Sequence, residues 1–206
     1  MTARTKTTDP RPRSRWSRDL VSAAAAALVA LGARSSLADH YHVPTGSMIP
    51  TIEVGAHVLV NKLAYGVRVP FTEAYALRFS GPAQGDVVVL DSPESDVVLL
   101  KRVVAVPGDL VEVRGGHVSL NGKPAPIEDH GGELFEALAG KVHAVKLDDG
   151  GGPDFGPVKV PADRYLVLGD NRGNSHDGRM FGFVARERIL GKASLLYGHD
   201  HGFSGL

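Results

Sequence analysis

A serine in a proline-bounded turn is the first residue of this chain that is suited to chemistry. Ser47 lies between Pro44 and Pro50, and Gly46 directly precedes it. The prolines fix φ at two points and the glycine relieves crowding, so such a turn can present a hydroxyl outward in a defined pose. A serine in a turn of this kind can equally be structural, and only a suitably placed base would make it a nucleophile.

Lys101 is the candidate base. It lies in residues 97–106, a segment made almost entirely of Val, Leu and Ala, and in a strand it shares a face with Leu99 and Val103. A lysine whose pKa in water is about 10.4 must lose about 3 pH units to be half neutral at pH 7, which costs about 4 kcal/mol. Burial can produce a shift of that size. The neutral amine could then accept the serine proton and later donate it to the leaving amine, as in Ser-Lys proteases.

Three other interpretations of these polar residues stay open from the residues alone. Lys101 could extend its ammonium group to the surface as an ordinary strand lysine. Ser47 could instead form a Ser-His-Asp triad with His57 or His176. Alternate histidines at residues 40 and 42 and at 199 and 201 suggest a metal site, but no carboxylate pattern with zinc spacing accompanies them. We expect no metal and no cofactor.

The elements that must position these residues are predicted to be short strands. Apolar segments alternate with turn residues, and Gly115-Gly116 and Asn121-Gly122 mark tight turns. This pattern favours a mainly β protein with an antiparallel, barrel-like catalytic domain. Residues 127–157, rich in Gly, Asp and His, are expected to form a small inserted subdomain with a helical turn at residues 133–138. The expected strands are residues 57–61, 86–90, 97–106, 110–113, 118–120 and 165–168.

Size and charge restrict the protein class. A chain of 206 residues with 43% hydrophobic residues can bury one good core. We expect the apolar side chains at positions 71, 75, 77 and 79 to join it, with a membrane-contacting edge as the alternative. Lys plus Arg and Asp plus Glu each number 23, so no net charge draws the chain toward nucleic acid. Because there is no cysteine, disulfides and thiol chemistry are excluded. We expect a monomer.

The N-terminal residues have the pattern of a membrane anchor. Six Arg and Lys residues and one Asp occupy the first eighteen positions, and an uncharged run of mostly Ala, Leu and Val follows from residue 20 to 33. Basic residues beside an apolar segment indicate the cytoplasmic side. The run is shorter than the about 20 residues of a spanning helix, but Arg34 can extend to the interface. A cleavable signal, with Ser36-Leu37-Ala38 as its small-residue site, and a buried helix are the alternatives.

These features predict a domain order along the chain. Residues 1–19 would be a basic cytoplasmic tail and residues 20–38 a transmembrane anchor. Residues 39–206 would be an extracytoplasmic catalytic β domain, with residues 127–157 as a variable insertion. The chain would therefore be a single-pass protein of the cytoplasmic membrane with its N-terminus in the cytoplasm.

Four segments, in the same order along the chain, resemble the motif boxes of bacterial type I signal peptidases. They are PTGSMIPT at residues 44–51, GDVVV at 85–89, KRVVAVPGD at 101–109 and GDNRGNSHDGR at 169–179. The resemblance extends from the apolar N-terminal segment to about residue 182. Four boxes in the family's order make it specific, whereas any single box would be weak.

The resemblance implies roles for individual residues. Ser47 would be the nucleophile and Lys101 the general base, and the oxyanion hole would consist of the Ser47 backbone N–H and the Thr45 hydroxyl. Ser175 would hydrogen-bond the lysine amine and orient it. Thr45 stands where the family commonly has serine, and it keeps the hydroxyl while restricting its rotamers.

An ion pair and a set of substrate contacts complete the implied site. Asp177 and Arg179 match a supporting ion pair of the family, and Gly178 between them replaces a position that is usually serine. The substrate peptide would add as an extended strand between the segment before the nucleophile and the segment that ends at the lysine. Shallow apolar pockets would accept alanine and exclude larger groups, giving Ala-x-Ala specificity. Their lining residues would be Val43, Met48, Leu99 and Leu100.

The expected function is therefore that of a membrane-anchored serine endopeptidase that removes signal peptides from exported preproteins. Its partners would be secretory preproteins and membrane lipid. A specialised processing protease of a conjugation or pilus system would use the same chemistry on few substrates. An inactive, membrane-tethered binding module is the least expected alternative, because such a module would not need Ser47, Lys101 and Ser175 together.

Overall fold

The computed structural model describes residues 16, 19–23, 38–69, 72, 75–198 and 202–206. The chain divides into two compact units, residues 1–35 and residues 36–206. In the first unit, residues 19–23 are helical. Among the described residues, no helix has the length and apolar character needed to cross a membrane. Of the expected anchor at residues 20–38, positions 24–37 lie outside the described residues.

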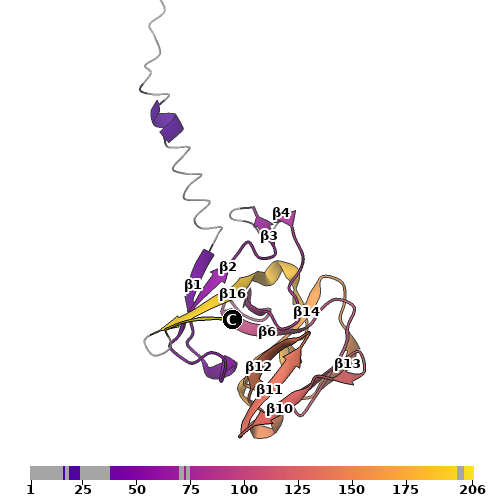
Figure 1. The fold of residues 1–206 in the computed structure, drawn as a ribbon. Coiled ribbons are helices and arrows are strands. Elements are labelled where there is room, and N and C mark those ends of the chain that lie inside the picture. Colours follow the sequence, from indigo (N-terminus) through magenta and orange to yellow (C-terminus); the bar gives the residue numbers. More distant parts are fainter. Residues whose placement is uncertain (1–15, 17–18, 24–37, 70–71, 73–74, 199–201) are drawn as a thin grey trace, which may run out of the picture. The chain divides into compact units, whose positions relative to one another are not determined.

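The second unit is built around one curled, eight-stranded antiparallel sheet (Figure 1). Its strands run in the order β1-β2-β16-β5-β6-β14-β15, and β17 pairs with β16. This sheet joins segments far apart in sequence, because β5 pairs with both its chain neighbour β6 and the C-terminal strand β16. The strands are β1 (Ala38–His42), β2 (His57–Asn61), β5 (Val87–Asp91), β6 (Val98–Ala105), β14 (Arg164–Leu168), β15 (Val184–Ala185), β16 (Ile189–Gly198) and β17 (Gly202–Gly205).

Three smaller antiparallel sheets accompany the main one: β13-β7-β8-β9, β10-β11-β12 and β3-β4. Their strands are β3 (Gly66–Arg68), β4 (Tyr75–Arg78), β7 (Leu110–Arg114), β8 (His117–Leu120), β9 (Lys123–Pro124), β10 (Ile127–His130), β11 (Glu133–Leu138), β12 (Lys141–Val145) and β13 (Phe155–Lys159). The helical segments are short: η1 (Gly46–Met48), η2 (Asp149–Gly151), η3 (Arg172–Asn174), α2 (Gly178–Phe181) and η4 (Arg186–Arg188).

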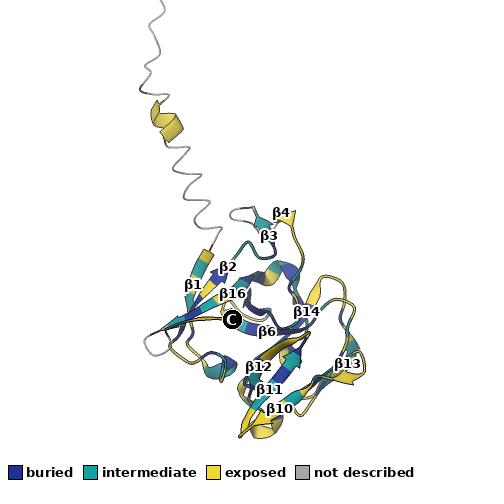
Figure 2. Cartoon of the chain, in the orientation of Figure 1, coloured by how far each residue is buried: buried dark blue, intermediate teal, exposed yellow. Residues whose placement is uncertain are grey.

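The prediction of a mainly antiparallel β protein is confirmed, and all six expected strands are present with each end within one residue of its predicted position. The central strands β5 and β6 are rich in β-branched residues, and residues 87–90 of β5 and 101–105 of β6 are buried on both faces; Figure 2 shows buried residues in dark blue. Because side chains from both faces of this sheet are covered, the apolar residues form three clusters around it rather than one.

The prediction of a helical turn at residues 133–138 is wrong, because this segment is strand β11. Gly131 and Gly132 before it and Ala139 and Gly140 after it all have positive φ. Such residues make tight turns that reverse the chain, so the segment pairs with β10 on one side and β12 on the other. The predicted insertion is therefore mostly a three-stranded sheet, and its expected end at residue 157 falls inside β13.

The expected core position of the side chains at 71–79 is wrong where the structure describes them. Leu77 is 60% exposed and Phe79 is 49% exposed, while Tyr75 is partly buried. Residue 71 lies outside the described residues. β3 and β4 form a separate two-stranded sheet, in which the burial pattern of β4 is mostly exposed. Tyr75 packs instead among arginines, with three guanidinium groups 5.0, 5.6 and 5.7 Å from its ring.

Candidate active site

The turn that carries Ser47 is fixed by hydrogen bonds from Asn171 and by the buried Met48 side chain. Ser47 lies in η1, where the backbone carbonyl of Met48 accepts a hydrogen bond from the Ile52 N–H at 2.9 Å. Asn171 donates its backbone N–H to the Ser47 carbonyl at 3.1 Å and its side-chain amide to the Gly46 carbonyl at 3.2 Å. The Met48 side chain is 1% exposed and anchors the turn in the core. The backbone around the serine is therefore fixed by groups distant in sequence.

Lys101 points from β6 directly at this serine. Its Nζ lies 2.6 Å from Ser47 Oγ and 3.1 Å from the Leu100 carbonyl oxygen, and the residue is 3% exposed. The interpretation of Lys101 as a lysine that reaches the surface is therefore wrong. Burial lowers the pKa of Lys101 from 10.5 to about 8, although the negative charges of Asp177 and Asp170 act in the opposite direction. An amine with this pKa is available as a base near neutral pH.

A cleft of about 330 Å³ opens beside the pair. It is bordered by residues 41–45 before the nucleophile and by residues 97–101 at the start of β6. The structure thus brings the four residues predicted to contact substrate into one cleft with Ser47 and Lys101, and most of the exposed cleft surface is apolar. These four are Val43, Met48, Leu99 and Leu100.

Thr45 lines the same cleft, two residues before the nucleophile. It is exposed, has extended backbone angles and makes no side-chain capping bond to η1. Its hydroxyl is thus not committed to the short helix that carries Ser47. Thr45 and Ser47, which carry the two implied oxyanion-hole donors, both line the cleft.

Ser175 approaches the site from the loop that follows β14. Its Oγ is buried and makes no hydrogen bond, so the bond to the Lys101 amine implied by the resemblance is not formed here. Gly169 explains how the loop fits, since a Cβ at this position would lie 2.3 Å from Ser175 Oγ and 2.4 Å from the Ser47 carbonyl oxygen. Only glycine allows the two serines to approach the same point of the backbone.

The predicted ion pair between Asp177 and Arg179 is present and buried. Arg179 Nε lies 2.8 Å from one carboxylate oxygen and a terminal nitrogen lies 2.9 Å from the other. Asp177 also accepts the Arg179 backbone N–H at the start of α2 and the Gly169 N–H at 3.0 Å. At Gly178, the position that is usually serine in the family, a Cβ would lie 2.7 Å from a Leu166 methyl carbon. Glycine at 178 therefore matches the tight packing beneath this turn.

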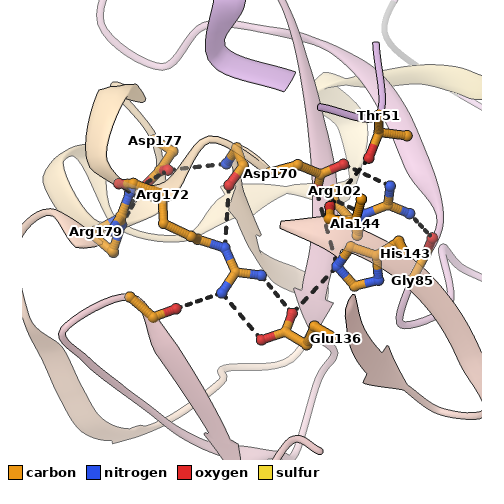
Figure 3. Close-up of polar contacts among 12 residues, drawn as sticks. Thr51, Gly85, Arg102, Glu136, His143, Ala144, Asp170, Arg172, Asp177 and Arg179 are labelled. Atoms are coloured by element: carbon orange, nitrogen blue, oxygen red, sulfur yellow. Dashed lines mark hydrogen bonds and ion pairs between the residues drawn. The ribbon is translucent and has the colours of Figure 1, made fainter. Parts of the chain in front are cut away.

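A buried group of charged residues behind the pair was missed from the sequence. Arg102, adjacent to Lys101, donates two hydrogen bonds to Asp170 at 2.8 and 2.7 Å. Glu136 on β11 and His143 on β12 reach the same region from the inserted sheet (Figure 3). A signal was available, because a tight turn at Ala139-Gly140 places residue 136 directly opposite residue 143.

The histidines proposed for a catalytic triad have their contacts elsewhere. His176 Nε2 lies 2.7 Å from the Glu94 carboxylate, and the His57 ring stacks on Tyr197 with centroids 5.3 Å apart. The Ser47 hydroxyl faces Lys101 instead. Within the described part of the chain, no group of three or more histidine or acidic side chains is arranged to hold a metal ion.

Comparison with known proteins agrees with this geometry. Residues 15–198 match the family model described as "Signal peptidase, peptidase S26". A signal peptidase I from Leptolyngbya laminosa is 34% identical over 176 residues, which cover 81% of this chain and 71% of that protein. A signal peptidase I from Pseudomonas fluorescens is 35% identical, covering 80% of this chain and 66% of that protein.

A solved structure gives a partial match in three dimensions. The crystal structure of a signal peptidase I from Enterococcus faecalis covers 56% of this chain and 99% of its own, with 27% identity and a TM-score of 0.42. The family match spans most of the chain and includes every residue of the candidate site. This chain belongs to the type I signal peptidases of peptidase family S26.

Proposed function

We propose that this protein is a membrane-anchored serine endopeptidase that cleaves the signal peptides of exported preproteins after Ala-x-Ala-type sites, with Ser47 as nucleophile and Lys101 as general base. The observation that carries this proposal is the 2.6 Å approach of a buried lysine amine to a serine hydroxyl at the edge of an apolar cleft. A serine is a weak nucleophile until a neighbouring base accepts its proton, and Lys101 is placed to do so.

Acylation would proceed in two proton transfers. The neutral Lys101 amine accepts the Ser47 proton as Oγ attacks the scissile carbonyl carbon, which gives a tetrahedral oxyanion and an ammonium ion. The ammonium ion then donates this proton to the departing amine, the C–N bond breaks, and an ester links the signal peptide to Ser47. The mature protein leaves with a free N-terminus.

Deacylation would use the same lysine once more. A water molecule loses a proton to the neutral amine while its oxygen attacks the ester carbonyl. The Ser47 oxygen leaves and takes the proton back from the ammonium ion, and the signal peptide is released with a new carboxylate. Because the lysine must be neutral at the start of both half-reactions, its lowered pKa serves each of them.

The oxyanion of both tetrahedral intermediates needs hydrogen-bond donors that are already in place. The Ser47 backbone N–H and the Thr45 hydroxyl are the proposed donors, and loss of one such donor typically costs about 100-fold or more in turnover. The β-branched threonine side chain has fewer rotamers than serine, so its hydroxyl would lose less freedom when it binds the oxyanion.

Recognition of the substrate would rely on backbone pairing and small pockets. The residues before Ser47 and those that lead to Lys101 form facing borders of the cleft, so an extended peptide could lie between them as an added strand. Val43, Met48 and Leu99 would offer apolar surface for alanine side chains. Larger side chains would clash with this surface, which supports cleavage after Ala-x-Ala.

The proposed location follows from the basic N-terminal residues and the uncharged run beyond them. A single-pass anchor at residues 20–38 would place residues 39–206 outside the cytoplasmic membrane, next to translocating preproteins. The protein would then meet its preprotein substrates at the membrane surface. One copy of the chain carries all the proposed catalytic groups, so a monomer suffices.

The decisive test compares Ser47→Ala and Lys101→Met with the wild type in cleavage of an Ala-x-Ala preprotein by the full chain in detergent. Each variant should lose at least about 1,000-fold in kcat, because members of such a dyad act together. Lys123→Met, which changes an exposed lysine on β9, serves as the control and should retain wild-type kcat. Substantial activity of either dyad variant would refute the mechanism.

Substrate range needs a separate measurement in the host cell. Depletion of the protein should cause many unprocessed preproteins to accumulate if it acts generally. Accumulation of only one or two would instead identify a specialised processing protease of the same chemistry.

A further inference from the structure

The inserted sheet carries two polar side chains that are buried toward the catalytic domain. Glu136 on β11 is 0% exposed and His143 on β12 is 7% exposed, and they are direct cross-strand partners. Buried ionisable groups are costly unless they are paired, so their partners indicate why they are inside. Both side chains point at the segment of residues 169–172, which follows β14 (Figure 3).

Glu136 holds Arg172 by two hydrogen bonds. Both terminal nitrogens of the guanidinium donate to the carboxylate, and neither side chain is exposed. Burial by itself would raise the pKa of Glu136, but His143 and Arg172 lower it to about 2, so the carboxylate is charged. Arg172 in turn donates its Nε–H to the Gly169 carbonyl at 3.2 Å. The inserted sheet thus restrains the backbone at Gly169.

Gly169 and its neighbours touch the catalytic groups directly. Gly169 lies so close to Ser175 Oγ and the Ser47 carbonyl oxygen that a Cβ at this position would clash with both. Asn171, two residues later, donates its N–H to the Ser47 carbonyl. Any shift of this segment therefore moves the backbone of the nucleophile.

His143 packs between the Glu136 and Asp170 carboxylates, although neither of its ring nitrogens makes a hydrogen bond. Its Nε2 lies 3.3 Å from the Glu136 carboxylate and 4.0 Å from that of Asp170. Asp170 binds Arg102, the residue next to Lys101, through two hydrogen bonds. Contacts of the inserted sheet therefore lead to both members of the catalytic pair.

We propose that Glu136 and His143 are positioning residues for the Ser47–Lys101 pair, and that they act by fixing residues 169–172. The inference rests on the proposed function. By this proposal the inserted sheet takes part in catalysis, although it lies outside the four motif segments of the sequence. Neither residue lines the substrate cleft, so neither is a substrate contact.

A merely structural role would have different consequences. Loss of general attachment between the inserted sheet and the rest of the domain would lower the amount of folded protein without changing the turnover of what remains. Loss of positioning would lower kcat and leave KM unchanged, because a displacement of about 1 Å at reacting groups costs up to about 100-fold in rate. The two roles are therefore separable by steady-state kinetics on folded enzyme.

The test uses Glu136→Gln, which removes the charge and keeps the shape, in the full chain in detergent. Lys141→Met is the matched control, because Lys141 lies on the same sheet and its ammonium group binds Asp86, the residue before β5, at 2.6 Å. We expect kcat of Glu136→Gln to fall by about tenfold or more with KM within about twofold, and kcat of Lys141→Met to stay within about twofold. Folding is checked by near-ultraviolet circular dichroism.

His143→Gln keeps the proposal testable if Glu136→Gln does not fold, and it should lower kcat by about threefold to tenfold at constant KM. Wild-type kcat in the folded variant tested, or an equal loss in Lys141→Met, would overturn the inference. Ser47→Ala is measured beside them. If that variant cleaves like the wild type, the proposed function itself has failed, whereas an inactive Ser47→Ala beside a fully active Glu136→Gln refutes the positioning role alone.

Discussion

Replacement of Lys101 by methionine should make the protein more stable at neutral pH while it abolishes activity. Lys101 is almost fully buried, and its pKa falls from the ordinary 10.5 to about 8 because burial penalises the charged form. The gap between these values, at about 1.36 kcal/mol per pH unit, corresponds to about 3 kcal/mol. Methionine has a similar length and no charge to bury.

The sign of the effect follows from proton binding in the two states. Below pH 8 the lysine is protonated in both the folded and the unfolded chain, so the full penalty of burying a charge is present. Between pH 8 and 10.5 the folded state has lost the proton while the unfolded state keeps it, and the free energy of unfolding of the wild type rises with pH. The advantage of Lys101→Met should therefore shrink as pH increases.

The magnitudes can be worked out for two measurable pH values. Between pH 7 and 9.5 the wild type should regain about 2 kcal/mol relative to Lys101→Met. Loss of the hydrogen bond to Ser47 subtracts about 1 kcal/mol from the variant at every pH. We thus expect Lys101→Met to be about 2 kcal/mol more stable at pH 7 and about equal to the wild type at pH 9.5.

Urea unfolding of the full chain in detergent at both pH values measures these differences. Lys123→Met, at an exposed position on β9, is the control, because a side chain that remains in water carries no burial penalty. A constant difference between Lys101→Met and the wild type at pH 7 and 9.5 would refute the argument that burial sets the protonation of this lysine.

Two further outcomes follow from the site. Because Lys101 with a pKa of about 8 is about one-tenth neutral at pH 7 and about nine-tenths neutral at pH 9, kcat/KM should rise about tenfold between these values, and a kcat/KM independent of pH in this range would exclude Lys101 as the base. Gly169→Ala should lower kcat by about 100-fold, since its Cβ would displace the Ser47 carbonyl and Ser175; retention of wild-type kcat in peptide cleavage would show that the loop can move without harm.

The sequence allowed the juxtaposed pair of Ser47 and Lys101 to be proposed because the features that suggest it are local. A serine between prolines and a lysine in an apolar strand are visible in single segments, and the order of four motifs supplied Thr45, Ser175 and the Asp177–Arg179 pair. The strands were predictable for the same reason, since apolar runs between turns specify them without knowledge of their partners. Each of these signals can be recognised within one short segment, without knowledge of what the segment packs against.

The charged groups behind the pair could not be predicted in this way. Glu136 and His143 lie in a segment whose Gly, Asp and His content is typical of a loop, and their burial depends on contact with residues 169–172. A polar residue on a strand gives no sign of which face will be covered until the neighbouring sheet is placed. The exposure of Leu77 and Phe79 has the same origin, because a two-stranded hairpin on its own leaves apolar side chains in solvent.

The site contains several buried charged side chains and also a lysine that must be neutral to act as a base. Among the lysines and arginines that the structure describes as buried, Lys101 is the one lysine. Arg102, Arg172 and Arg179 each pair with a buried carboxylate through charge-assisted hydrogen bonds. Asp177 and Asp170, although paired, still act to raise the pKa of the Lys101 amine, but burial outweighs them. Burial can then dominate the pKa of Lys101, which is the condition that a lysine base requires.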